Sequence, residues 1–197
     1  MTLGKTSPNK KIDQYFMQKN IFYISGRGGN FTTGLGKYLA TKANELDGLG
    51  LSNEFLSQEF ETQLDIISKM IISADAKKTI FIANSYGAYL LMHALFSKDI
   101  ELSKLILISP ILGSSYYGNR FFKPPYSRRL NELMSGTGHK LPKDTTVIWG
   151  TEDNGIDQNA IQKLSFQCID IKLIEINEQK HDIDKRILAK TLDRILD

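Results

Sequence analysis

Ser85 stands at a point in the chain where a serine could act as a nucleophile. It separates an apolar run at residues 79–84 from a second one at residues 88–96, which predicts a sharp strand-to-helix turn. Such a turn strains the backbone of the serine and projects its hydroxyl from the sheet. Ala83 and Gly87 supply the small residues that the turn needs two positions away, although glycine is more usual than alanine at the first. An ordinary turn with a serine helix cap is the alternative interpretation.

A serine hydroxyl is a poor nucleophile at neutral pH, so it needs a base, and the base needs a carboxylate to orient it. Both residue types follow later apolar runs. Glu152 and Asp153 come after the run at residues 145–149, and His181 and Asp182 come after the run at residues 171–176. The order of serine, carboxylate and histidine along the chain predicts a nucleophilic triad of Ser85, Asp153 and His181.

Other residues compete for these roles. Glu152 and Asp182 are alternatives to Asp153, although Asp182 adjoins the histidine and is poorly placed to reach behind its ring. His93 lies inside the apolar run at residues 88–96, which favours a packed core histidine over a catalytic one. His139 lies in a glycine-rich stretch, which favours an exposed residue over one that lines a pocket.

Acyl transfer also needs two backbone N–H groups for the oxyanion. Tyr86, the residue after the candidate nucleophile, supplies one, and we expect Arg27 to supply the other from the glycine-rich loop at residues 25–30. Nucleotide binding does not explain this loop. Phe31 replaces the third glycine of G-x-G-x-x-G, and it also replaces the first glycine of a P-loop ending at Gly36 and Lys37.

The elements that must position these residues alternate between strands and helices, which is typical of an α/β protein with a mostly parallel central sheet and helices on both faces. Apolar runs predict strands at residues 21–25, 79–84, 104–109, 145–149 and 171–176, with a short one near 50–52, and we expect both faces of these strands to be buried. Helical patterns fall at about residues 35–46, 57–74, 88–96, 156–166 and 184–196. Residues 1–20 are expected to form a tail or an extra helix, and residues 21–197 a single domain.

With these motifs and elements, the chain resembles the α/β-hydrolase superfamily, in particular its small serine hydrolases and esterases with little lid. The resemblance runs from residue 21 to the C-terminus. It implies Ser85 as nucleophile, His181 as base and Asp153 as acid, because the family places the acid in a Gly-x-x-Asp turn after its strand. It also implies that Arg27 and Tyr86 provide the backbone oxyanion donors and that no cofactor is needed.

Residues 111–141 are long for a connection and occupy the place where the resembled family inserts caps over the active site. The aromatic and apolar residues that could wall an acyl pocket there are Tyr116, Tyr117, Phe121, Phe122, Tyr126, Leu130, Leu133 and Met134. For at least half of them core packing is the preferred interpretation.

The same region concentrates positive charge. Between residues 112 and 143 the basic residues are Arg120, Lys123, Arg128, Arg129, Lys140 and Lys143, against Glu132 alone. These residues could guide an anionic or carrier-bound substrate toward the site, or they could form a solvated face.

Composition excludes several function classes. A net charge of +3 over 197 residues does not indicate nucleic-acid binding, and no apolar run approaches the length of a membrane span. The single cysteine and three histidines do not indicate a metal site. Residues 1–20 are polar and do not resemble a secretory signal, so we expect a cytoplasmic protein. The sequence therefore predicts a serine hydrolase that cleaves a carboxylic ester or thioester, with an acyltransferase or a non-catalytic binding protein on the same fold as alternatives.

Overall fold

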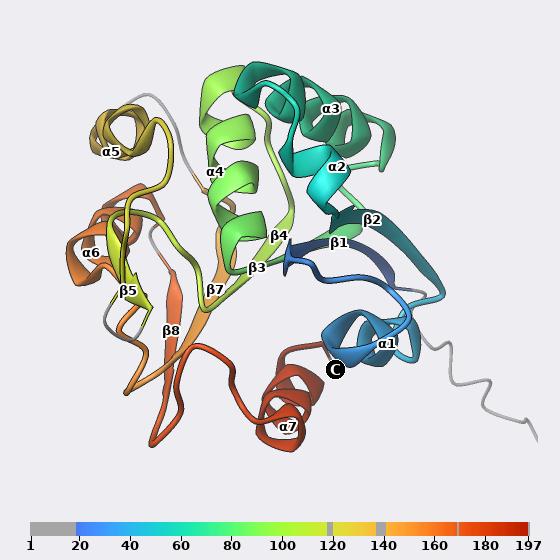
Figure 1. Ribbon diagram of the computed structural model, residues 1–197. Coiled ribbons are helices and arrows are strands. Elements are labelled where there is room, and N and C mark those ends of the chain that lie inside the picture. Colours follow the sequence, from blue (N-terminus) through green and yellow to red (C-terminus); the bar gives the residue numbers. More distant parts are fainter. Residues whose placement is uncertain (1–18, 118–119, 137–140, 169, 197) are drawn as a thin grey trace, which may run out of the picture.

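The computed structural model of the protein describes residues 19–117, 120–136, 141–168 and 170–196. Its centre is a six-stranded sheet with the strand order β2-β1-β3-β4-β7-β8, in which every neighbouring pair is parallel (Figure 1). The strands are β1 (Asn20–Arg27), β2 (Glu45–Leu51), β3 (Thr79–Asn84), β4 (Lys104–Ile108), β7 (Asp144–Gly150) and β8 (Lys172–Ile176). The predicted fold class is confirmed.

Helices cover both faces of this sheet and form two separate apolar cores. On one face, α1 (Gly34–Ala40) and α7 (Lys185–Leu196) pack on the sheet, and they lie together below it in Figure 1. The opposite face carries α3 (Phe60–Ser73), α4 (Tyr86–Lys98), α5 (Ser127–Ser135) and α6 (Gln158–Gln167). Among these, α4 is buried along nearly its whole length, because it lies between the sheet and the outer helices.

The expectation of strands buried on both faces holds in the middle of the sheet and is wrong at its edge. In β3 and β4 most side chains are buried. In β8 Lys172, Leu173 and Glu175 are exposed, because this strand has a neighbour on one side only and little cover beyond it.

Another correction concerns the segment after β1. The predicted helix at residues 35–46 ends at Ala40, and the chain then forms β2, a seven-residue strand where only a short one near residues 50–52 was expected. Two glycines weaken the strand pattern of β2. Gly48 has φ +134°, and a β-carbon there would lie 2.0 Å from the carbonyl oxygen of Tyr23 on β1. Pairing with β1, rather than local propensity, therefore stabilises this strand.

The helix predicted at residues 57–74 also differs in its bounds. The structure has a short helix before it, α2 (Asn53–Leu56), and the longer helix α3 begins only at Phe60.

The long connection at residues 111–141 contains a small antiparallel hairpin of β5 (Ser115–Tyr117) and β6 (Arg120–Phe122), followed by α5. The hydroxyl of Tyr89, on α4, donates a hydrogen bond to the carbonyl oxygen of Pro125, which fastens this segment to the main core. Residues 1–18, most of the predicted N-terminal tail, lie outside the described part of the chain.

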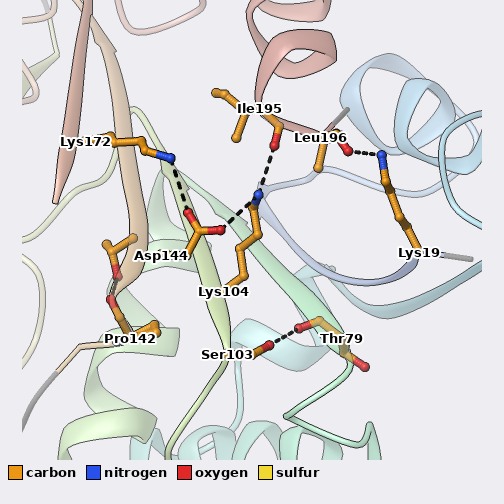
Figure 2. Close-up of polar contacts among 10 residues, drawn as sticks. Lys19, Thr79, Ser103, Lys104, Pro142, Asp144, Lys172, Ile195 and Leu196 are labelled. Atoms are coloured by element: carbon orange, nitrogen blue, oxygen red, sulfur yellow. Dashed lines mark hydrogen bonds and ion pairs between the residues drawn. The ribbon is translucent and has the colours of Figure 1, made fainter. Parts of the chain in front are cut away.

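The amino ends of the strands, opposite the carboxyl edge, hold the C-terminal helix in place (Figure 2). The Lys104 ammonium donates a 2.9 Å hydrogen bond to the carbonyl oxygen of Ile195, and it lies 3.1 Å from the Asp144 carboxylate. Lys19 donates to the carbonyl oxygen of Leu196. Cations therefore satisfy carbonyl groups at the end of α7, where no intrahelical donor remains.

No helix within the described ranges is long and apolar enough to cross a membrane.

Candidate active site

The turn between β3 and α4 presents Ser85 at the carboxyl edge of the sheet. Ser85 has φ 53° and ψ −119°, a strained conformation for a residue with a side chain. Its N–H donates to the carbonyl oxygen of Ile108 on β4, at 2.9 Å. The turn is tight because Gly87 touches β1, where a β-carbon would lie 2.3 Å from the carbonyl oxygen of Ser25. This contact is the physical reason for a small residue two positions after the serine.

Two later loops bring a histidine and a carboxylate to this serine. The Oγ of Ser85 lies 2.8 Å from Nε2 of His181, which follows β8. The Nδ1 atom of the same ring lies 3.0 Å from Oδ2 of Asp153, which follows β7. Both distances are within the range for a nucleophile, a base and the carboxylate that orients the base. The structure thus brings the three predicted side chains together in a line.

The competing carboxylates are placed elsewhere. The side chain of Asp153 is completely buried, and its Oδ1 accepts a 2.8 Å hydrogen bond from the N–H of Gly155. Glu152 is exposed, and Asp182 is exposed beside the histidine. Gly155 also leaves space for the ring, since a β-carbon there would lie 3.1 Å from Nδ1 of His181. Burial and this N–H hold the Asp153 carboxylate fixed behind the imidazole.

The glycine-rich loop after β1 reaches the candidate nucleophile. A β-carbon on Gly26 would lie 3.2 Å from Cβ of Ser85, so the loop passes directly over that side chain. The buried Ser25 hydroxyl accepts from the Leu51 N–H and donates to the Gly26 carbonyl, both at 2.9 Å, which pins the start of the loop. Tyr86 is the first residue of α4, and its N–H therefore has no acceptor inside the helix.

A cavity of about 380 Å³ opens at this point. Its lining includes Ser85, His181, both predicted oxyanion residues Arg27 and Tyr86, and the apolar side chain of Phe122. The cavity therefore brings the predicted nucleophile, the predicted base and both predicted oxyanion residues to one surface.

A second cavity, of about 360 Å³, lies between α1 and α7 and was missed in the sequence. It shares Asn84, His181 and Asp182 with the first cavity, so both meet at the histidine. Its apolar lining consists of Leu35, Tyr38, Ile183, Leu188 and Ala189. The helical pattern of residues 184–196 predicted an amphipathic helix, but the pattern does not tell which apolar positions pack on the sheet and which face a cavity.

The structure places the pocket candidates of the insertion in different surroundings, and core packing holds for several of them, as expected for at least half. Phe122 lines the first cavity, whereas Leu130 and Met134 are buried in the core under α5. Tyr116 and Phe121 are more than half exposed and pack against each other on the hairpin. The side chain of Tyr117 is outside the described part of the chain. The hairpin therefore contributes one wall residue, and α5 serves packing.

The two remaining pocket candidates, Leu133 and Tyr126, also lie either against the core or on the surface. Leu133 packs against the core of this face, and Tyr126 is exposed with its ring stacked on Phe60.

Two basic residues of the insertion lie away from Ser85. Arg129 pairs with Glu61 on α3 and donates a 3.2 Å hydrogen bond to Ser97, near the end of α4 opposite Ser85. Arg128 pairs with Glu132 one turn along α5 and is 90% exposed. At 1.5 Å per residue, the twelve residues from 85 to 97 span about 18 Å. Steering by this pair is therefore not supported by their placement.

The other two histidines have no place in this site. His93 is fully buried on α4, where burial, aided by the charge of Arg129, lowers its pKa to about 3. His139 lies outside the described residues.

Comparison of the coordinates with solved structures supports the fold. The esterase Est1E from Butyrivibrio proteoclasticus matches with a TM-score of 0.62 and 16% identity, over 91% of this chain and 87% of that one. A thioesterase domain from the curacin biosynthetic pathway matches with a TM-score of 0.58 and 10% identity, over 92% of each chain. A monoacylglycerol lipase from Paleococcus ferrophilus matches with a TM-score of 0.65 and 10% identity, over 91% of this chain and 96% of that one.

The chain has the α/β-hydrolase fold. At 10–16% identity these α/β-hydrolase structures are similar to it in fold alone. No protein-family model and no curated sequence matches the chain.

Proposed function

We propose that this protein is a serine hydrolase that cleaves a carboxylic ester or thioester through an acyl-serine intermediate. The observation that carries the proposal is the continuous contact from Asp153 through His181 to Ser85 at the mouth of an open cavity. A buried carboxylate, an imidazole and a strained serine in this order have no evident role in packing, whereas together they form an activated nucleophile.

In the first half of the reaction, Oγ of Ser85 attacks the carbonyl carbon while Nε2 of His181 takes the hydroxyl proton. The carbonyl oxygen becomes an oxyanion, which the N–H groups of Arg27 and Tyr86 stabilise. The tetrahedral intermediate then collapses, and the bond from carbon to the leaving oxygen or sulfur breaks. The leaving atom receives the proton from His181, and the acyl group stays on Ser85.

In the second half, His181 takes a proton from a water molecule, whose oxygen attacks the acyl carbon. Collapse of the second tetrahedral intermediate returns this proton to Oγ of Ser85 and releases the carboxylic acid. Asp153 remains ionised throughout and stabilises the imidazolium that forms in each half. The balance needs only water, so no cofactor takes part in this scheme.

A fluorophosphonate probe together with aryl esters from acetate to decanoate tests the proposal. Ser85 should be phosphonylated with loss of fluoride, as located by peptide mass spectrometry, and at least one ester should be hydrolysed. Ser85→Ala should lose labelling and about 10⁴- to 10⁶-fold of turnover while its circular dichroism spectrum is unchanged. A wild-type protein that is neither labelled nor active would instead favour a non-catalytic binding protein.

A further inference from the structure

The first cavity contains a positively charged side chain that the reaction scheme does not use. The proposed oxyanion role of Arg27 involves only its backbone N–H, yet Arg27 lines the cavity together with Ser85 and His181. Arg27 is exposed to solvent, so its charge reaches the cavity without being buried.

Two aromatic rings hold this guanidinium over the cavity. Its central carbon lies 4.2 Å from the ring centroid of Tyr86 and 5.1 Å from that of Phe122. Tyr86 is itself fixed, since its ring is 3% exposed and stacks on Tyr89. Such cation–π contacts keep the plane of the guanidinium in place. The guanidinium also forms a side-chain hydrogen bond with Tyr86, which uses part of its donor capacity. A guanidinium has five N–H donors, so others can bind a ligand.

Among the described residues, no carboxylate neutralises this cation. Within the residues that the structure describes, Arg27 forms no ion pair with an acidic side chain. The acidic side chain that shares its cavity is Asp182, which is exposed and lies next to His181, where the two cavities meet. The cavity is therefore polarised, with a cation at the Arg27 wall and an anion at the histidine wall.

The chemistry of the proposed reaction assigns the two cavities to different parts of a substrate. His181 must protonate the leaving atom, so the leaving group lies on the histidine side. The second cavity is lined by His181, Asp182 and Ile183 but not by Arg27 or Tyr86. His181 lines both cavities, whereas Ser85 lines only the first. The acyl group, which becomes bonded to Ser85, therefore faces the first cavity and its guanidinium, and the second cavity is left for the leaving group.

We propose that the acyl group accepted by this enzyme carries a carboxylate and that Arg27 binds it, so that the substrates are half-esters or half-thioesters of dicarboxylic acids. The inference rests on the proposed function. A planar guanidinium matches a carboxylate with two parallel hydrogen bonds, and no carboxylate of the described residues pairs with Arg27. The Asp182 carboxylate would repel a substrate carboxylate at the histidine wall, and this repulsion also favours binding of the substrate carboxylate at Arg27.

Matched pairs of aryl esters test this inference. Mono-4-nitrophenyl esters of diacids from succinate to suberate are compared with the same compounds methylated on the free carboxyl, and the rate with Ser85→Ala is subtracted as background. For at least one chain length, the wild-type protein should show a kcat/KM for the charged ester about tenfold above that for its methyl ester. This ratio should fall as salt is added, because Arg27 is exposed to solvent.

Arg27→Gln keeps the backbone N–H and removes the charge, and it should abolish the preference, bringing the ratio to one or below. The ratio is the readout because any disturbance of the loop affects both esters of a pair. Arg27→Lys should retain part of the preference, since it keeps the charge without the planar fork. Arg128→Gln, which removes one positive charge from an exposed residue that does not line the cavity, is the matched control and should leave the ratio unchanged.

The failure of this inference can be distinguished from failure of the proposed function. If neutral esters are hydrolysed and Ser85 is labelled, but the ratio is the same in wild type and Arg27→Gln, Arg27 does not select the acyl group and the inference is overturned. If Arg128→Gln lowers the ratio as much as Arg27→Gln, general surface charge explains the preference, and the inference is overturned as well. If no ester is hydrolysed and Ser85 is not labelled, both proposals fall.

Discussion

The hydroxyl of Ser109 donates a 2.9 Å hydrogen bond to the carbonyl oxygen of His181. Ser109 follows β4 directly, is 1% exposed and has φ 41°, and its N–H donates to the carbonyl oxygen of Ile148 on β7. The loop that carries His181 is thus attached by a side chain to the middle of the sheet. The other contacts of this loop run to the β7 loop, where the Glu152 N–H donates a 2.8 Å hydrogen bond to the carbonyl oxygen of Gln179 and Asp153 contacts His181.

Ser109→Ala should therefore reduce catalysis without preventing folding. Loss of one buried hydrogen bond costs about 1 kcal/mol, and the freed loop should place Nε2 of His181 less accurately against Ser85. We expect kcat to fall about tenfold while KM stays within about twofold, because Ser109 is a positioning residue. Ser103→Ala, which removes a 3.4 Å hydrogen bond at the opposite edge of the sheet, is the control. Equal kcat values for the two variants would contradict the role of Ser109.

The two adjacent acids of the β7 loop give a sharp test of the carboxylate. Asp153→Asn keeps the size of the side chain but replaces the acceptor of His181 Nδ1–H with an amide, so kcat should fall about 10³- to 10⁴-fold. Glu152→Gln changes the same charge one residue earlier on an exposed side chain, and kcat should change less than about twofold. Initial rates with an aryl ester measure both. A larger loss in Glu152→Gln would reassign the carboxylate.

Gly87 allows a test of the close approach between α4 and β1. Alanine is normally better than glycine inside a helix by about 1 kcal/mol. Here the added methyl would lie 2.3 Å from a carbonyl oxygen that cannot move without displacing β1, so the clash should dominate. Urea unfolding of Gly87→Ala should show a loss of about 2–3 kcal/mol, with reduced activity because Ser85 moves with the helix.

Gly136→Ala is the matched control for this substitution. Gly136 has φ −72°, and its nearest neighbour to a new β-carbon is 3.4 Å away, which is ordinary contact. The free energy of unfolding of Gly136→Ala should equal that of wild type or exceed it by up to about 1 kcal/mol. If both variants are equally stable, the contact of Gly87 with β1 does not restrict residue size.

The sequence predicted the features that local patterns determine. β3 and β4 are nearly continuous apolar runs, and the residues that follow strand ends, Ser85, Asp153 and His181, could be found because their order along the chain is informative. β2 was largely missed because its two glycines lower its propensity and pairing with β1 supplies the stabilisation.

Contacts between distant segments account for the other errors. Leu130 and Met134 have the same apolar pattern whether they face a cavity or the core, and only the position of α5 against α4 and α6 separates these cases. The side chain of Arg27 meets Tyr86 and Phe122, which are 59 and 95 residues away in the chain. No local pattern in the sequence encodes such a contact, so the cation in the cavity could be identified only from the structure.

His93 lies on α4 beside the rings of Phe60 and Tyr89, at centroid distances of 5.0 and 4.7 Å and in T-shaped geometry. Within the described part of the chain neither ring nitrogen has a hydrogen-bond partner. Burial, with a smaller contribution from the Arg129 charge, lowers the pKa of His93 to about 3 in the folded protein. In the unfolded chain a histidine titrates near pH 6.5.

Below pH 6.5 the unfolded state therefore binds a proton that the folded state does not, and the free energy of unfolding falls as the pH falls. From pH 7.5 to pH 5 this single group should remove about 2 kcal/mol of stability. His93→Leu has no such proton, so urea unfolding at the two pH values should show a decrease about 2 kcal/mol smaller than in wild type, whatever the stability of the variant at pH 7.5. An equal decrease in both proteins would mean that His93 can be protonated in the folded state, for example through a water molecule that reaches its ring.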